Sequence, residues 1–263
     1  MVNIRRVLEH AMGNSTPERM KQTWNSLASR NSMHFIATDK AHWDVGSFFS
    51  IGKQRLHNIL HRMGVSPSDC KGNLVDLGCG IGRFAFAFAE LFDTVLGVDI
   101  SEEMIRKANA LKVERGCTNV EFYCNNGSDL AFIPTGSYDF AFSYTVLQHI
   151  PDKRIVFQYI KELGRIVRPG GKILFQVLTY QDRALAQIVR LGLLSFYRVL
   201  WQAERVGLVP PEQGAAFHGS RLTVGEVERG MHANDLRIIA IDRQHGAHRF
   251  CDETMILCQK SCG

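Results

Sequence analysis

The stretch LVDLGCGIGRFA, Leu74–Ala85, decides the fold, because it places three glycines directly behind a short apolar run. Glycine allows positive φ and a close approach of the backbone to a ligand, so Gly78, Gly80 and Gly82 predict a ligand-binding turn between a strand and a helix. Their G-x-G-x-G spacing is one residue shorter than a dinucleotide turn, and the Gly-Lys-Ser/Thr ending of a phosphate-binding loop is absent. Asp76 would repel a pyrophosphate, so the turn suits a ligand with an ammonium or sulfonium group nearby.

From Asn73 onward, short apolar runs alternate with longer amphipathic runs. We expect strands at 73–77, 94–99, 120–124, 138–144, 172–177, 236–242 and 253–259. Helices are expected from Gly82 to about Phe92, over 101–116 with Ser101 as the N-cap, and from Asp152 to Val167, with a turn at Pro169-Gly170-Gly171. This alternation predicts an α/β fold: a doubly wound, mostly parallel seven-stranded sheet with helices on both faces and an antiparallel C-terminal hairpin.

The chain is expected to form one domain with four parts. Residues 1–66 form a helical N-terminal cap, in which Phe48 to Met63 is the clearest helix, and residues 72–178 form the ligand-binding core. Residues 180–220 form a helical lid insertion after the fifth strand, and residues 221–263 form the last helix and the hairpin. Ligands of open α/β sheets bind at the carboxyl ends of the strands, where such additional segments commonly act as lids.

Composition excludes several classes of protein. The 263 residues carry a formal net charge of +5 without a Lys/Arg run, so no nucleic-acid partner is expected. Seven cysteines without a framework spacing indicate free thiols in a reducing compartment, and hence a cytoplasmic location. The N-terminus lacks the apolar core of a signal peptide, and no apolar run is long enough to predict a membrane span.

VDLGCGIG resembles the first motif of the class I, seven-stranded S-adenosylmethionine-dependent methyltransferases. Asp99, 21 residues after Gly78, matches the acidic residue that accepts both ribose hydroxyls in that family. SYDFAFSYTVLQHIPD (137–152) and RIVRPGGKILFQV (165–177) resemble later motifs of its small-molecule branch. The resemblance covers residues 72–178 and, in outline, the hairpin. It implies a Rossmann-like fold and S-adenosylmethionine as the cofactor, with S-adenosylhomocysteine as the product.

The resemblance also implies a set of cofactor-binding residues. These are Asp76, Gly78, Cys79, Gly80, Gly82, Asp99, Ile100, Met104, Asn126, Gly127, Ser128, Ser143, Tyr144 and Gln148. Asn126 departs from the family, which usually has an aspartate there for the adenine amino group; its amide oxygen accepts the same hydrogen bond without a charge. Cys79 is interpreted as a small filler of the turn, and Tyr144 as lining the methionine end of the pocket.

Three histidines are candidates for a general base. His149 follows the fourth strand, where donor and acceptor should meet, and a histidine there can deprotonate a phenol, hydroxyl or amine. The alternative is that His149 orients a loop by hydrogen bonding. His218 and His248 are further candidates for the base. His248 also lies at a three-residue interval from His245 and from Cys251, but no fourth ligand is nearby, and we expect no metal.

Two segments outside the core allow more than one interpretation. The aromatic residues of the N-terminal part either close over the cofactor or pack on the sheet: Trp24, His34, Phe35, Trp43, Phe48 and Phe49. The apolar run LGLLSFYRVLW, Leu191–Trp201, forms a lid, a homodimer contact or a helix at a membrane surface.

The predicted activity is methyl transfer to a small-molecule acceptor with a hydrophobic body, most often at oxygen and otherwise at nitrogen or carbon. We expect the acceptor to have a hydrophobic body because the insertion at 180–220 is apolar. Methylation of RNA or protein is a second class, which the sequence Ser143-Tyr144-Thr145-Val146 disfavours because base N-methyltransferases usually have Pro-Pro-Tyr there. A protein that binds S-adenosylmethionine without turnover is a third.

Overall fold

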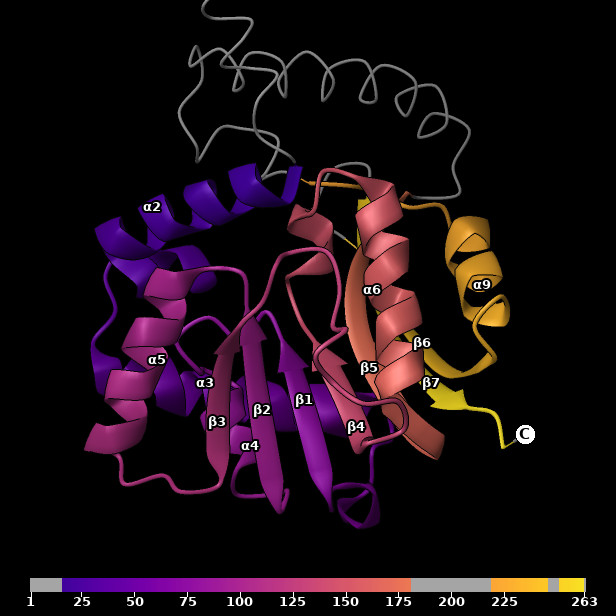
Figure 1. Ribbon diagram of the computed structural model, residues 1–263, viewed down its shortest axis with the longest axis horizontal. Helices are drawn as coiled ribbons and strands as arrows, with labels where there is room; N and C mark the ends of the chain where they lie inside the picture. Colours follow the sequence, from indigo (N-terminus) through magenta and orange to yellow (C-terminus); the bar gives the residue numbers. More distant parts are fainter. Residues whose placement is uncertain (1–15, 181–218, 246–250, 263) are drawn as a thin grey trace, which may run out of the picture.

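The computed structural model describes residues 16–180, 219–245 and 251–262, and they form a seven-stranded sheet (Figure 1). Its strands, in the order β3-β2-β1-β4-β5-β7-β6, are β1 Asn73–Leu77, β2 Thr94–Asp99, β3 Val120–Cys124, β4 Tyr138–Ser143, β5 Val167–Tyr180, β6 Leu236–Gln244 and β7 Cys251–Lys260. The first five strands pair in parallel, and β7 pairs antiparallel with both β5 and β6. The predicted sheet and its C-terminal hairpin are therefore confirmed.

Helices cover both faces of the sheet: α5 and α6 lie in front of it in Figure 1, and α3 and α4 lie behind it. The described helices are α2 Thr16–Ile36, α3 Val45–Arg62, α4 Ala85–Phe88, α5 Glu102–Glu114, α6 Lys153–Ile166 and α9 Val224–His232, with the 3₁₀ turns η1 Pro67–Asp69 and η2 Leu147–His149. The expected cap at Ser101 is present, since Ser101 Oγ accepts from the Met104 N–H at 3.2 Å. Asp152, expected as the first residue of the next helix, is its N-cap instead, and its carboxylate accepts from the Arg154 N–H at 2.9 Å. Most of the lid expected at 180–220, namely residues 181–218 with Leu191–Trp201, lies outside the described residues.

Two local expectations were wrong. A helix was expected from Gly82 to about Phe92, but the α-helix there is only the four-residue α4. The residues on both sides of α4 form turns with i→i−3 hydrogen bonds instead, such as that from the Gly82 N–H to the Cys79 carbonyl at 2.9 Å. The turn expected at Pro169–Gly171 instead lies within β5. The pairing of β4 with β5 jumps there from Tyr138–Val167 to Phe140–Lys172, so the extra residues form a bulge in a longer strand.

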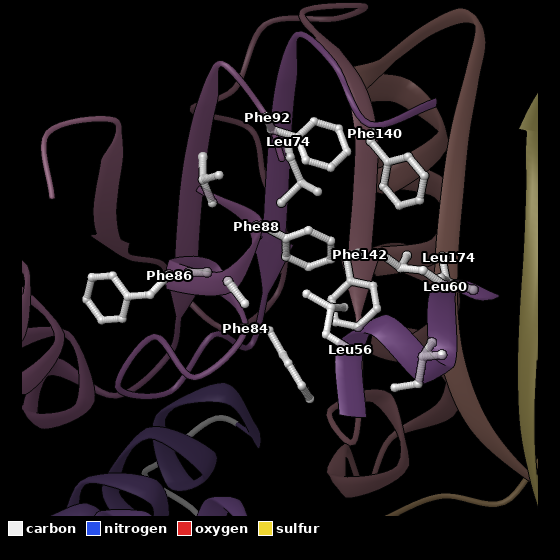
Figure 2. Packing of buried hydrophobic residues seen from close by; sticks show 14 of the residues in the cluster. Leu56, Leu60, Leu74, Phe84, Phe86, Phe88, Phe92, Phe140, Phe142 and Leu174 are labelled. Carbon is white, nitrogen blue, oxygen red and sulfur yellow. The ribbon is translucent and has the colours of Figure 1, made fainter. Parts of the chain in front are cut away.

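Successive residues of β1 serve opposite faces of the sheet. Leu74 belongs to the apolar cluster beneath α3 and α4, and Val75 belongs to the cluster beneath α6. Figure 2 shows the first cluster, in which Phe88 and Phe142 pack edge to face with their ring centroids 4.9 Å apart. Asp76 shares the face of Leu74, so the strand places a carboxylate in the otherwise apolar layer under α3 and α4.

Helix α2 crosses over the carboxyl ends of the parallel strands (Figure 1). The Asn25 amide oxygen accepts from Ser101 Oγ at 2.7 Å and from the Glu103 N–H at 3.2 Å, which fixes α2 to the start of α5. Lys107 of α5 donates to the Ala28 carbonyl of α2 at 2.7 Å. These contacts hold α2 over the edge of the sheet where ligands of this fold bind.

Candidate active site

The glycine turn after β1 has the backbone that its sequence predicts. Gly78, Gly80 and Gly82 have φ angles of 77°, 55° and 87°, a region that side chains disfavour. A Cβ on Gly78 would lie 2.1 Å from a methyl carbon of Val146, in the loop after β4. The turn is therefore packed directly against that loop, and only glycine fits at Gly78.

Asp99, the last residue of β2, is held in place by two backbone groups. Its Oδ2 accepts from the Gly80 N–H and its Oδ1 from the Ser101 N–H, each at 2.9 Å. Burial raises the pKa of Asp99, and the hydrogen bonds from Ser101 and Gly80 oppose that rise. Each carboxylate oxygen keeps a lone pair for a further donor, as a ribose with two hydroxyls requires.

Asp76 is the second carboxyl beside the turn and is buried, with 2% of its surface exposed. Its Oδ2 has no hydrogen-bond partner among the described residues. Burial, and secondarily the charge of Asp99, raises the pKa of Asp76 to about 8. A cation bound in front of the turn would favour the ionised carboxylate, so this orphaned oxygen fits the ammonium and sulfonium of S-adenosylmethionine.

A cavity of about 1050 Å³ opens in front of the turn, at the carboxyl ends of β1 and β4, where the strand order reverses. This volume is at the upper end for ligand sites, and it accommodates a cofactor together with a second molecule. The predicted residues that line it are Gly78, Cys79, Gly80, Asp99, Ile100, Met104, Tyr144, Gln148 and His149. Burial raises the pKa of the Cys79 thiol well above its ordinary value, which agrees with its interpretation as a filler.

The other predicted cofactor residues are not part of the lining: Asp76, Gly82, Asn126, Gly127, Ser128 and Ser143. The Asn126 amide oxygen is used locally, since it accepts from the Ser128 and Asp129 N–H groups at 2.9 and 3.1 Å. Its neighbour Asn125 lines the cavity instead and donates to the Tyr159 hydroxyl at 2.9 Å. Asn125 directly follows β3, which is the signal that sequence reasoning missed.

His149 lies at the junction of α2 and η2. Its ring is edge-on to that of Trp24, with the centroids 5.5 Å apart, and both residues line the cavity. Trp24 is thus one aromatic residue of the N-terminal part that reaches the site. Gln148 also lines the cavity, and its buried Oε1 has no partner within the described part of the chain. His218 and His248 lie outside the described residues.

The rest of the cavity lining combines apolar and charged residues. Tyr144 packs edge to face on Phe84 with the ring centroids 5.5 Å apart, and burial raises the pKa of the Tyr144 phenol. Ile51 of α3 and Ile36 of α2 also line the cavity, together with polar and charged residues that the sequence did not single out: Asp39, Gln54, Arg55, Asn58, Arg62, Arg83, Arg221, Gln244 and Glu253.

Of the stretch around His245, the structure describes His245 itself and the residues from Cys251 onward. His245 Nδ1 lies 2.8 Å from Asp252 Oδ1. Within the ranges that the structure describes, no group of three His, Cys, Asp or Glu side chains has the arrangement of a metal site. In the same ranges, no helix combines the length and the apolarity needed to cross a bilayer.

Comparison with known proteins agrees with this geometry. Residues 74–171 match the family model of a methyltransferase domain. The ubiquinone biosynthesis O-methyltransferase of Idiomarina loihiensis is 27% identical over 232 residues, which are 86% of this chain and 87% of that protein. The arsenite methyltransferase of Aquipseudomonas alcaligenes is 37% identical over 136 residues, 48% of this chain but only 38% of that protein.

A solved structure extends the likeness to nearly the whole chain. Magnesium protoporphyrin IX methyltransferase from Synechocystis PCC 6803, with bound S-adenosylmethionine, has a TM-score of 0.62 at 14% identity and covers 95% of this chain and 99% of that chain. At this identity the likeness concerns the fold. The matched residues, the sheet order and the glycine turn with its two carboxyls lead to one conclusion: residues 74–171 form a methyltransferase domain within a class I, Rossmann-like fold, whose cofactor is S-adenosylmethionine.

Proposed function

We propose that the protein methylates an oxygen atom of a small molecule whose hydrophobic body binds against Tyr144 and Phe84. The single observation that carries this proposal is the continuity of the cavity: one space joins Asp99 and the glycine turn to the aromatic wall under α3. The similarity to an O-methyltransferase over 86% of this chain supports oxygen as the acceptor atom.

The residues of the chain hold the donor and shape the site. Asp99 would bind the ribose hydroxyls, and the lining backbone of Gly78 and Gly80 would lie against the cofactor. When bound, S-adenosylmethionine supplies an electrophilic methyl group. Helix α2 covers the site through Trp24 and Met20, which restricts water and holds the reactants in one orientation.

Oxygen methylation releases a proton if the acceptor is not already ionised, and we assign its removal to His149. This histidine lines the cavity, and the adjacent Gln148 amide lies 3.4 Å from its Nε2. His149→Ala should lower kcat by at least about 100-fold while leaving the affinity for S-adenosylhomocysteine unchanged. His57→Ala removes an exposed histidine of α3 as the matched control. If His149→Ala changes KM alone, the histidine only orients the loop.

The acceptor class is tested with a labelled methyl group. We expect radioactivity from [methyl-¹⁴C]S-adenosylmethionine to enter a small-molecule fraction of a metabolite extract, and Asp99→Ala to abolish that incorporation. Label that enters RNA or protein instead would replace the proposed substrate class. Binding of the cofactor without label in any fraction would point to a protein that binds S-adenosylmethionine without turnover.

A further inference from the structure

Four arginines line the cavity. Arg55 and Arg62 lie on α3, Arg83 directly follows the glycine turn, and Arg221 precedes α9. These segments are far apart in the sequence, and the fold brings their positive charges to one cavity. A chamber for a purely apolar acceptor would not require this arrangement, because cations are costly to desolvate.

Arg83 is the most deeply buried of these charges, with 3% of its surface exposed. Its Nε donates to the Phe48 carbonyl at 3.2 Å, and its guanidinium carbon lies 4.8 Å from the centre of the Phe48 ring and 5.4 Å from that of Trp43. A Cβ on Gly52 would lie 2.7 Å from Arg83 Cγ, so this glycine of α3 makes room for the side chain. The position of Arg83 is therefore specified by its surroundings.

Arg83 lacks a counter-ion in the described structure. No salt bridge joins it to a described carboxylate, and its buried Nη2 has no hydrogen-bond partner there. Burial, and secondarily the charge of Arg55, lowers the pKa of Arg83 to about 10, so the side chain stays charged at pH 7. A buried cation of this kind is stabilised by an anion that binds beside it.

The neighbouring charges are distributed differently. Arg55 forms an ion pair with Asp39, and Arg62 lies 3.4 Å from an oxygen of Asp242. Glu253 contributes one further negative charge to the lining. Arg55 and Arg62 thus each face a carboxylate, whereas Arg83 has no salt bridge to a described carboxylate and keeps an unpartnered Nη2.

We propose that the acceptor carries an oxyanion, a carboxylate or a phosphate, which binds beside Arg83 with support from Arg55. This inference rests on the proposed function and names the class of its substrate: an amphiphile whose hydrophobic body contacts Phe84 and Tyr144. The planar guanidinium matches both oxyanions, and a hydrogen bond between charged partners is stronger than one between neutral partners. The contacts of Arg83 with Phe48 and Trp43 position the guanidinium for this task.

Calorimetry with three probes of equal chain length tests the proposal: octanoate, octyl phosphate and octanol. Each is titrated into the full chain, once without a cofactor and once saturated with S-adenosylhomocysteine. We expect at least one oxyanion probe to bind about tenfold or more tightly than octanol. The preferred probe shows whether the site takes a carboxylate or a phosphate. Equal affinities for all three probes, or no binding of either oxyanion, would overturn the proposal.

Variants then locate the charge. Arg83→Gln and Arg55→Gln should each weaken binding of the preferred oxyanion probe about tenfold or more and leave binding of octanol unchanged. Lys53→Gln is the control and should change the binding of neither probe, because Lys53 pairs with Glu90 and does not line the cavity. If Arg83→Gln does not fold, Arg83→Lys takes its place and should retain part of the affinity. Unchanged oxyanion binding in the Arg83 variant overturns the assignment. If the proposed function itself is wrong, the labelled-methyl experiment shows it separately, because no small molecule is then methylated.

Discussion

Asp76 is expected to lower the stability of the protein without its cofactor. Its carboxyl is buried, one oxygen is unpaired among the described groups, and its pKa is raised from 3.8 to about 8. At pH 7 the unfolded chain ionises this group, whereas the folded chain without cofactor keeps it protonated. The pH interval between 3.8 and 7, at about 1.4 kcal/mol per unit, corresponds to a cost of about 4 kcal/mol.

Asp76→Asn removes this cost, because a carboxamide does not ionise. We expect the variant to gain about 2 kcal/mol in the free energy of unfolding at pH 7, about half the full amount, since the new N–H group is left unpaired. The sign of this pH dependence follows from the raised pKa. The contribution of Asp76 to the stability of the folded native chain is most favourable below pH 3.8, and it becomes less favourable as the pH rises from 3.8 to 8. The gain should therefore shrink as the pH is lowered towards 4.

Urea denaturation of the two proteins without cofactor, at pH 5 and pH 7, measures the difference. Glu114→Gln, at an exposed acid of α5, is the control and should change the stability by less than about 0.5 kcal/mol. Asp76→Asn should also weaken S-adenosylmethionine binding and reduce the proton release that calorimetry detects when the native protein binds it near pH 7. A variant less stable than the native chain at both pH values would refute the reasoning about Asp76.

The other predictions concern Asp99 and the glycine turn. Asp99→Ala should weaken S-adenosylhomocysteine about 100-fold through the loss of two charge-assisted hydrogen bonds to the ribose, and an unchanged dissociation constant would remove that role. Gly78→Ala should lower both the melting temperature and the cofactor affinity, because the new Cβ would lie 2.1 Å from Val146. Gly116 also has a positive φ but has open space around it, so Gly116→Ala should lower the stability only by the backbone strain of about 1 kcal/mol. Equal losses in these two variants would show that backbone strain alone is responsible.

Much of the fold could be predicted because its signals are local. The apolar strands, the cap at Ser101 and the helix start at Asp152 are encoded in consecutive residues, and the structure has these elements. The bulge at Pro169–Gly171 could not be predicted, because a turn and a bulge use the same residues and only the pairing of β4 with β5 separates them.

The cofactor end of the site was more predictable than the acceptor end. Motif spacing locates Asp99 and the turn, but it does not show which of two adjacent asparagines faces the cavity, and the structure places Asn125 there. Arg55 and Arg62 appear in the sequence as the ordinary polar face of an amphipathic helix. Their role depends on the packing of α3 against the turn, which no local pattern encodes.

The cavity therefore has charges of both signs around it. Asp99 lines the cavity at the glycine turn, with Asp76 buried behind that turn, and Arg83 lines the cavity without a salt bridge to a described carboxylate. An anionic head group would be drawn towards Arg83 and repelled by the carboxylates, so the field of the protein would orient an amphiphilic acceptor before any contact at its reacting oxygen. Reversing one charge tests this: Arg83→Glu should impair an oxyanion-bearing acceptor far more than Arg83→Gln does, while a neutral acceptor of the same shape should respond equally to both variants.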